Sequence, residues 1–242
     1  MMIDKLARNP LAMLLAFLLA AIAGAAIFAA LRPASGAVDA AAVRAALLEN
    51  PEIIPEAMQR LRDKETGKVI ASQRASIVTP FGKAWKGAAD PQVTVVAYMD
   101  YACGFCRQSL PMIDKLIASD PGVRVVFREL PVLSAESRVA AEYSLAAAEQ
   151  GKFATFHDTL FAAGQLSQAS IDAAIDRAGL DRTRAKAFIA TPAAEQEISR
   201  NLQTAGQLGV TGTPSWVVGD RVLSGAVTLE AMKEAVAAAR AA

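Results

Sequence analysis

The sequence predicts an α/β protein in which a βαβ unit and a later ββα unit are separated by a helical insertion. An apolar run, Val93–Met99, is followed by a segment with helical periodicity and by a second apolar run, Val123–Phe127. Near the C-terminus, two short apolar runs flank Gly219-Asp220, a pair that favours a tight hairpin turn. The long stretch between these two units contains helix signals throughout.

The N-terminus, residues 1–36, predicts a membrane anchor or a signal peptide. Lys5 and Arg8 precede an uncharged apolar run over residues 10–31, which would span about 30 Å as a helix and could cross a bilayer. Signal-peptide cores are usually shorter, so the length favours an uncleaved anchor, with cleavage near Ala34–Ala37 as the alternative. Either outcome places the rest of the chain outside the cytoplasm, where disulfides persist.

Residues 37–80 predict a separate helical segment. Asp39 can cap a first helix, and Asn50-Pro51 can start a second one, whose periodicity is interrupted by Gly67 and then fades. The second helix carries an apolar stripe formed by Ile54, Met58 and Leu61. Because such a stripe must be buried, we expect it to pack on its own domain, on a membrane surface, or on a second copy of the chain through residues 39–66.

Residues 81–242 predict the main domain, which begins near Phe81. The unbroken apolar character of Val93–Met99 predicts a buried strand, and apolar residues then recur at helical spacing over residues 107–118. Pro121-Gly122 turns the chain into the second strand. A strand, a helix and a strand of these lengths form a βαβ unit with a right-handed crossover.

The helical insertion is expected at about residues 134–208. Cap residues and apolar spacing predict helices that start at Ser134, Phe153, Ser170 and Thr191-Pro192. Gly151 and Gly179 are expected to end the first and third of these helices. The insertion therefore contributes only helices to the domain.

The chain returns to strands after the insertion. Trp216–Val218 and Arg221–Leu223 form the two arms of the predicted hairpin, and Thr228 can cap a final helix. The resulting order is βαβ, a helical insertion, then ββα. This order is a thioredoxin-like fold with an inserted helical domain.

The two cysteines of the chain stand in Cys103-Gly104-Phe105-Cys106, where the first strand meets its helix. A cysteine at the first turn of a helix faces unpaired N–H groups and the positive end of the helix dipole, and both favour the reactive thiolate. A cysteine three positions later lies on the same face and can close a disulfide. We therefore expect Cys103 to be an exposed attacking thiol and Cys106 a more buried resolving thiol. Asp100 could raise the thiol pKa, relay a proton, or simply end the strand.

Two other interpretations of the cysteine motif are weaker. A zinc site would need two further ligands, but the chain offers His157 as its single histidine and has no third cysteine. A purely structural disulfide that closes a two-residue loop would constrain the unfolded chain very little. We expect no metal and no cofactor, and we expect His157 to be a packing or surface residue.

Gly104, Phe105, Thr213 and Pro214 are the candidate substrate-binding residues. Gly104 leaves room for an approaching sulfur atom, and Phe105 supplies apolar surface. Thr213-Pro214 stands just before a strand, where a proline cannot donate to the ladder. If the bond between them is cis, the N–H and C=O groups of Thr213 are free to pair with an extended substrate.

The chain resembles the DsbA-like bacterial thiol–disulfide oxidoreductases from about Thr79 to the C-terminus. The resemblance is carried by residues 100–106, 153–161 and 209–215. Residues 48–54 are similar to the N-terminal helical region of the ScsC-like branch, some members of which self-associate through this region and isomerise disulfides. The resemblance implies a periplasmic enzyme with Cys103 and Cys106 as its redox pair and with Pro214 in the cis form.

The resemblance also implies partners: cysteine-containing exported proteins as substrates, and a membrane redox partner that reoxidises or reduces the dithiol. The strongest oxidases of the family have Pro-His between the cysteines and valine before the cis-proline, whereas this chain has Gly104-Phe105 and Thr213. These differences favour a disulfide isomerase or reductase, with a DsbA-type dithiol oxidase as the alternative. A non-catalytic, membrane-tethered thioredoxin-like binding module is the alternative from another class. The net charge of +1 gives no reason to expect a nucleic-acid partner.

Overall fold

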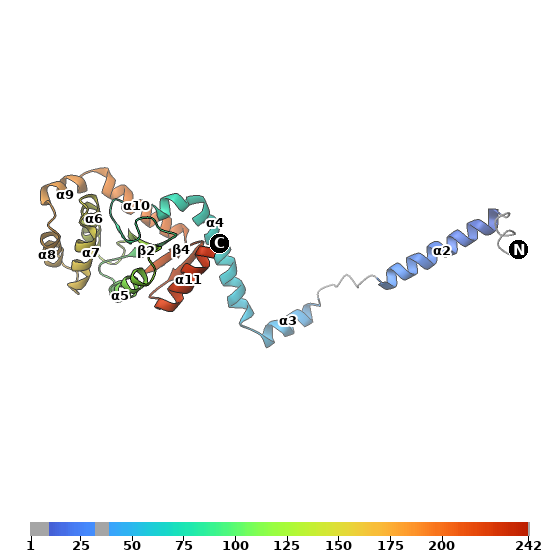
Figure 1. Ribbon diagram of the computed structural model, residues 1–242. Helices are drawn as coiled ribbons and strands as arrows, with labels where there is room; N and C mark the ends of the chain where they lie inside the picture. Colours follow the sequence, from blue (N-terminus) through green and yellow to red (C-terminus); the bar gives the residue numbers. More distant parts are fainter. Residues whose placement is uncertain (1–9, 32–38, 242) are drawn as a thin grey trace. The chain divides into compact units, whose positions relative to one another are not determined.

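The computed structural model describes residues 10–31 and 39–241 (Figure 1). Contacts divide the chain into two compact units, Met1–Met58 and Gln59–Ala242. The first unit contains helix α2 (Pro10–Leu31), helix α3 (Ala40–Glu49) and the beginning of helix α4 (Ile53–Val78). The cysteine motif and all five strands found in the described residues belong to the second unit.

The N-terminal apolar run forms α2, as its composition predicts. Within the residues that the structure describes, no helix is long and apolar enough to cross a membrane. The membrane anchor predicted over residues 10–31 is thus not confirmed. The flanking charges Lys5 and Arg8 and the alternative cleavage site at Ala34–Ala37 lie outside the described residues.

The segment after residue 39 differs from its prediction at Gly67. Asp39 caps α3 as expected, since its side chain accepts a hydrogen bond from the N–H of Ala41. Gly67, however, does not interrupt α4, which continues to Val78. A Cβ atom at this position would lie 3.4 Å from the backbone oxygen of Asp220, in the β4–β5 turn described below. The glycine therefore lets the helix pass close to the backbone of that turn.

The sheet has the strand order β1-β3-β2-β4-β5. Its strands are β1 (Trp85–Gly87), β2 (Val93–Met99), β3 (Val123–Glu129), β4 (Ser215–Val218) and β5 (Arg221–Ser224). Strands β2 and β3 run parallel, with Met99 beside Glu129, and this confirms the predicted βαβ unit. The hairpin β4–β5 is also confirmed, with Gly219 at φ +63°. Strand β1, an edge strand of three residues, was not predicted because it is too short to show periodicity.

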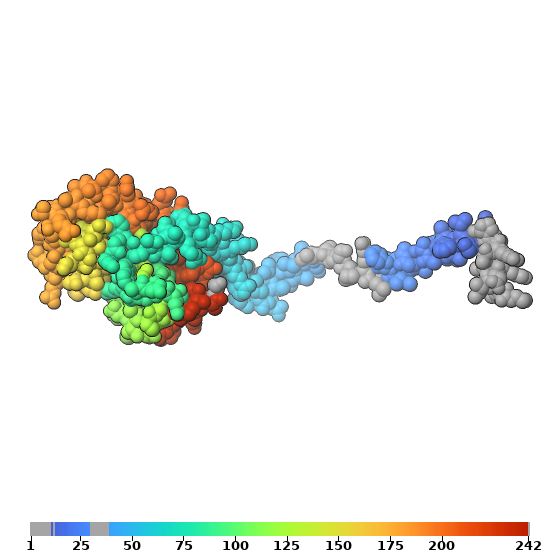
Figure 2. Space-filling view, turned by 45° about the horizontal axis from the view of Figure 1, so that its top comes forward, coloured from blue at the N-terminus to red at the C-terminus, as the bar shows by residue number. Residues whose placement is uncertain are grey.

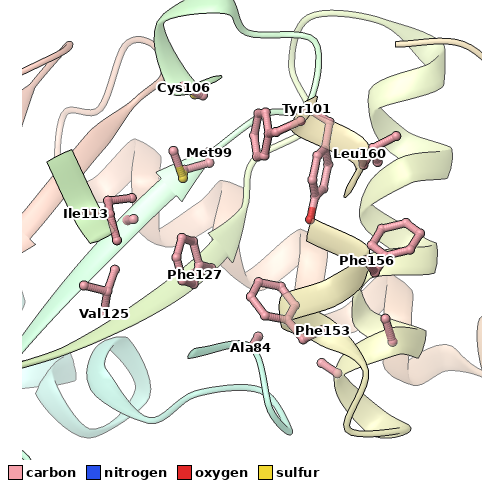
Figure 3. Packing of buried hydrophobic residues seen from close by; sticks show 14 of the residues in the cluster. Ala84, Met99, Tyr101, Cys106, Ile113, Val125, Phe127, Phe153, Phe156 and Leu160 are labelled. Atoms are coloured by element: carbon pink, nitrogen blue, oxygen red, sulfur yellow. The ribbon is translucent and has the colours of Figure 1, made fainter. Parts of the chain in front are cut away.

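Both faces of the sheet are covered by helices. On one face, β2 directs Val95 and Ala97 toward helices α5 (Gly104–Ser119) and α11 (Leu229–Ala241). On the other face, Val96 and Tyr98 pack with Ile70 of α4 and with helix α10 (Pro192–Gln207). Because successive strand residues point to opposite faces, one unbroken apolar run serves both layers. Figure 3 shows the packing on the first face, with Met99, Ile113 and Val125 close together.

The inserted helices gather at one side of this unit, coloured yellow to orange in Figure 2. They are α6 (Ala135–Glu149), α7 (Phe153–Ala162), α8 (Gln168–Ala178), α9 (Arg182–Ile189) and α10. Ser134 caps α6 as predicted. Helix α8 is capped by Ser167, not started by Ser170, because Ser170 completes a reciprocal capping box with Ser167. Helix α9, capped by Asp181, was not predicted.

A buried ion pair fixes the end of α4 to the domain. Arg128 of β3 pairs with Glu197 of α10, and both side chains are almost fully buried. The Arg128 guanidinium also donates to the backbone oxygens of Ser76, Ile77 and Thr79. These carbonyls stand at the C-terminal end of α4, where a helix lacks its own donors. Arg128 therefore satisfies this helix end and its own buried charge together.

Candidate active site

Cys103 occupies the N-cap position of α5. Its backbone is extended, with φ −81° and ψ 114°, and its Sγ accepts a hydrogen bond from the N–H of Cys106 at 3.3 Å. The sulfur therefore takes the place of a capping oxygen and faces the unpaired N–H groups of the first turn. The sulfur thus lies at the positive end of the α5 dipole.

The two cysteines differ in burial, but less than predicted. Cys106 is 0% exposed, as expected for a resolving thiol, whereas Cys103 is only 7% exposed and the expectation of an exposed thiol was wrong. The cause is the loop before β4, since the Cys103 thiol lies 3.2 Å from the backbone oxygen of Thr213 and donates to it. Both cysteines are free thiols in the structure.

Burial raises the pKa of the Cys106 thiol far above that of a free cysteine. A backbone hydrogen bond from Asp100 acts in the opposite direction, and so does Thr213. The Thr213 hydroxyl is buried, and its Oγ1 atom has no hydrogen-bond partner among the described residues. The surroundings of Cys106 therefore favour its protonated form.

Strand pairing brings Thr213 and Pro214 to the cysteines. Tyr98 lies opposite Ser215 in the antiparallel β2–β4 pair, so the residues before β4 continue past the end of β2 toward the cysteine motif. The Thr213–Pro214 bond is cis, as the family resemblance implied. Cys103, Cys106, Thr213 and Pro214, distant in the sequence, thus converge at one end of the sheet.

The two residues between the cysteines leave the site open. Phe105 is 62% exposed, a large value for an aromatic side chain next to a buried sulfur. A Cβ atom at Gly104 would meet nothing closer than the Arg107 guanidinium at 3.9 Å. The surface beside the sulfur is therefore open at Gly104 and apolar at Phe105.

The buried side chain of Asp100 joins three segments of the chain through hydrogen bonds, so it is not free to act as a base. Its carboxylate accepts from the backbone N–H groups of Ala102, Val132 and Leu133 and from the hydroxyl of Ser137. These four bonds join the cysteine loop, the loop after β3 and the first turn of α6. They fill the acceptor sites of a side chain that is 1% exposed.

Sequence reasoning missed a buried polar cluster, which is centred on Tyr101. The Tyr101 hydroxyl lies 2.8 Å from Ser144 Oγ, 3.1 Å from His157 Nδ1 and 3.4 Å from Glu129 Oε1. Ser144 also donates to Glu129 at 2.6 Å. In Figure 3 the ring of Tyr101 points away from Cys106, with its hydroxyl toward Phe156 of α7. The sequence signal for this cluster was weak: Glu129 is an acidic residue at the end of the otherwise apolar strand β3.

The ionisable members of this Tyr101 cluster are shifted toward their uncharged forms. Burial raises the pKa of Glu129 to about 8, opposed by the hydrogen bond from Ser144 and increased further by the charge of Asp100. Burial lowers the pKa of His157 well below its usual value, and the charge of Lys86 acts in the same direction. His157 is 1% exposed among Phe127, Phe153 and Phe161, so it is a packing residue. In the part of the chain that the structure describes, no group of three or more His, Cys, Asp and Glu side chains could hold a metal ion.

We expect Glu129→Gln to change how stability depends on pH. An unfolded glutamate titrates near pH 4.3, so between about 4.3 and the folded-state pKa of about 8 the folded protein holds one proton more than the unfolded chain. The free energy of unfolding of the wild type therefore falls as the pH rises through this window. Glutamine stays uncharged, so the variant should gain stability relative to the wild type over the same window.

Urea unfolding of both proteins at a series of pH values, under one redox condition, measures this difference. A difference in the free energy of unfolding that stays constant from about pH 5 to pH 9 would contradict the raised pKa of Glu129.

Comparison with known proteins shows which family this chain is similar to. Residues 94–237 match the DSBA-like thioredoxin domain family, and residues 40–66 match the copper resistance protein ScsC N-terminal domain. A thioredoxin-like oxidoreductase from Silicibacter pomeroyi DSS-3 is 34% identical with a TM-score of 0.66, over 70% of this chain and 98% of that one. The thiol-disulfide exchange protein alpha-DsbA2 from Wolbachia pipientis is 28% identical with a TM-score of 0.66, over 74% and 97%.

A curated relative from Salinispora arenicola, Na(+)/H(+) antiporter NhaA 1, is 33% identical over 157 residues, which are 64% of this chain and 24% of the relative. The chain thus spans about a quarter of the length of the curated relatives it matches. The family match covers more than half of the chain, including both cysteines and the Thr213–Pro214 loop. The chain belongs to the DSBA-like thioredoxin domain family.

Proposed function

We propose that this protein is a thiol–disulfide oxidoreductase that acts on exported polypeptides through Cys103 and Cys106. The observation that carries the proposal is the position of Cys103, whose sulfur caps α5 and lies beside the Thr213 backbone. A sulfur held at a helix N-terminus is activated as a nucleophile, and a second sulfur three residues later can displace it. The family membership supports the same chemistry.

The first step is attack by the Cys103 thiolate on one sulfur of a substrate disulfide. A bond forms between Cys103 and that sulfur, the substrate disulfide breaks, and the other substrate sulfur leaves as a thiolate. Isomerisation is completed when a different substrate thiolate attacks the mixed disulfide and releases Cys103. Reduction is completed when the Cys106 thiolate attacks Cys103: the Cys103–Cys106 bond forms, the bond between Cys103 and the substrate sulfur breaks, and that sulfur leaves as a thiolate. The substrate has then gained two electrons and the protein is a disulfide.

The raised pKa of Cys106 slows its attack on the mixed disulfide. A buried thiol that holds its proton cannot attack at once, so the mixed disulfide survives long enough for a substrate thiolate to rearrange it. Asp100 and Thr213, which oppose the rise in pKa, help Cys106 to ionise when resolution is needed.

The proposed substrate-binding residues are Gly104, Phe105, Thr213 and Pro214. The exposed ring of Phe105 and the open space at Gly104 support contact with apolar, extended chains, and the backbone of Thr213 lies close to the reacting sulfur. Gly104-Phe105 and Thr213, in place of Pro-His and valine, favour the isomerase or reductase direction over the dithiol oxidase. A membrane redox partner would keep the pair in its working state.

We place this activity in the periplasm. The charged and apolar pattern of the N-terminus supports export, and an oxidising compartment supplies the disulfides that such an enzyme rearranges. Membrane anchoring through residues 10–31 has no support from the described helices and is not included.

Cys106→Ser tests the proposal directly. Without the resolving thiol, the Cys103 mixed disulfide should accumulate when the reduced variant meets a disulfide-containing protein such as insulin, and nonreducing electrophoresis with mass spectrometry would show it. Cys103→Ser is the matched control and should form no adduct. An absence of adduct with Cys106→Ser would contradict the proposal. It would leave the non-catalytic thioredoxin-like binding module as the better account.

We further infer that residues 39–66 mediate self-association. Leu48, Ile53, Ile54 and Met58 are each between 45% and 64% exposed, and Val43, Leu48 and Ile54 line one groove of the first unit. A cluster of large apolar side chains left in water is unusual and marks an interaction surface. The match of residues 40–66 to the ScsC N-terminal domain lies on the same segment.

Charged substitutions in the full-length chain test this self-association. Leu48→Glu and Ile54→Glu should each reduce the particle mass measured by light scattering to that of one chain. Gln59→Glu, on α4 like Ile54 but outside the apolar cluster, should leave the mass unchanged. A wild-type mass of one chain at concentrations of about 100 μM would contradict self-association in any physiological range.

A further inference from the structure

Arg107 is a charged residue of the first turns of α5 that the proposed mechanism does not use. Arg107 stands one helical turn after Cys103, and its backbone N–H donates to the Cys103 backbone oxygen at 3.2 Å. Helical side chains lean toward the N-terminus and cover the preceding turn, so the guanidinium lies over the start of α5. Its Nη2 atom would be 3.9 Å from a Cβ atom placed on Gly104. Arg107 is therefore at the edge over which a substrate approaches.

The insertion holds this guanidinium in place. Arg107 Nη1 donates to the backbone oxygen of Gly164, in the turn between α7 and α8. Gly164 has φ +83°, a conformation that side-chain-bearing residues rarely adopt, so this turn suits glycine. With Nη1 held, Nη2 stays near Gly104 and has no hydrogen-bond partner among the residues described by the structure. Arg107 itself is exposed to solvent.

Arg107 is exposed to solvent, whereas the acidic groups near the cysteines are buried. The Asp100 carboxylate is bound by four donors of the protein itself, so a substrate that arrives from solvent meets the Arg107 charge and not this carboxylate. Glu129 is also buried, within the Tyr101 cluster. The positive end of the α5 dipole adds to the field of Arg107 at the same place. A carboxylate on the substrate is therefore attracted at the edge of the site, and an ammonium group is repelled.

We propose that Arg107 is a specificity-determining residue, which makes the site prefer substrate cysteines flanked by Asp or Glu over cysteines flanked by Lys or Arg. The proposal rests on thiol–disulfide exchange at Cys103. Two other roles for Arg107 make a different prediction. If it acted only on the Cys103 sulfur, or only tied the insertion to α5, its loss would change the rates of all substrates by the same factor.

The test uses three symmetric disulfides made from one short peptide, with Glu, Gln or Lys on both sides of its single cysteine. The reduced full-length protein converts each peptide disulfide to two peptide thiols and becomes the Cys103–Cys106 disulfide, so electrons and protons balance. Rates are measured by acid quench and chromatography. Each rate is divided by the rate with dithiothreitol, which corrects for the intrinsic reactivity of the peptides.

We expect the corrected Glu-to-Lys rate ratio of the wild type to be roughly five, the size of an exposed ion pair, and to fall as salt is added. Arg107→Gln should bring the ratio to about one, and Arg107→Lys should keep most of it, because the charge is retained. Lys115→Gln, which removes the same charge farther along α5, should leave the ratio as in the wild type.

An equal Glu-to-Lys ratio in the wild type and in Arg107→Gln would overturn the proposal, even if the variant were slower with every peptide. A wild type that reduces none of the three peptides, while dithiothreitol reduces all of them, would overturn the proposed function, and the role of Arg107 with it. The two failures are thus distinguishable in one experiment.

Discussion

The arrangement of the site depends on the buried carboxylate of Asp100. It accepts from the cysteine loop at Ala102, from the loop after β3 at Val132 and Leu133, and from α6 at Ser137. A buried carboxylate is costly unless its oxygens are fully hydrogen-bonded, so the three segments must stay together for the charge to be tolerated. The thioredoxin-like core and the helical insertion are therefore held in one geometry at the point where the cysteines lie.

The two cysteines acquire different chemistry from their surroundings alone. Cys103 replaces a capping oxygen at the start of a helix, whereas Cys106 is fully buried, and this burial raises the pKa of its thiol. The insertion contacts residues on either side of the cysteine motif. It covers Tyr101 on one side of the motif and positions the Arg107 guanidinium through Gly164 on the other. A helical domain inserted between the two halves of the fold thus shapes the edge of the site.

Much of this arrangement could be predicted from the sequence because it follows from local patterns. The unbroken run Val93–Met99 predicted a buried strand, and the Cys-x-x-Cys motif was predicted at the junction of this strand and the next helix, where the structure has it. Predictions failed where a residue's role comes from a distant contact. Gly67 was predicted to interrupt a helix, but the helix continues, and the β4–β5 turn that lies close to it explains why this position suits glycine. The grouping of Tyr101, Glu129 and His157 arises from three segments that only the tertiary fold brings together.

The most direct test of the account is the reduction potential of the Cys103–Cys106 pair, measured by equilibration against glutathione with a gel-shift readout. We expect a reversible dithiol–disulfide couple near −180 mV or lower, in the range of isomerases and reductases. A potential near −120 mV would contradict that direction and identify a strong oxidase. The absence of any reversible exchange would contradict the central claim that these two cysteines are a redox pair.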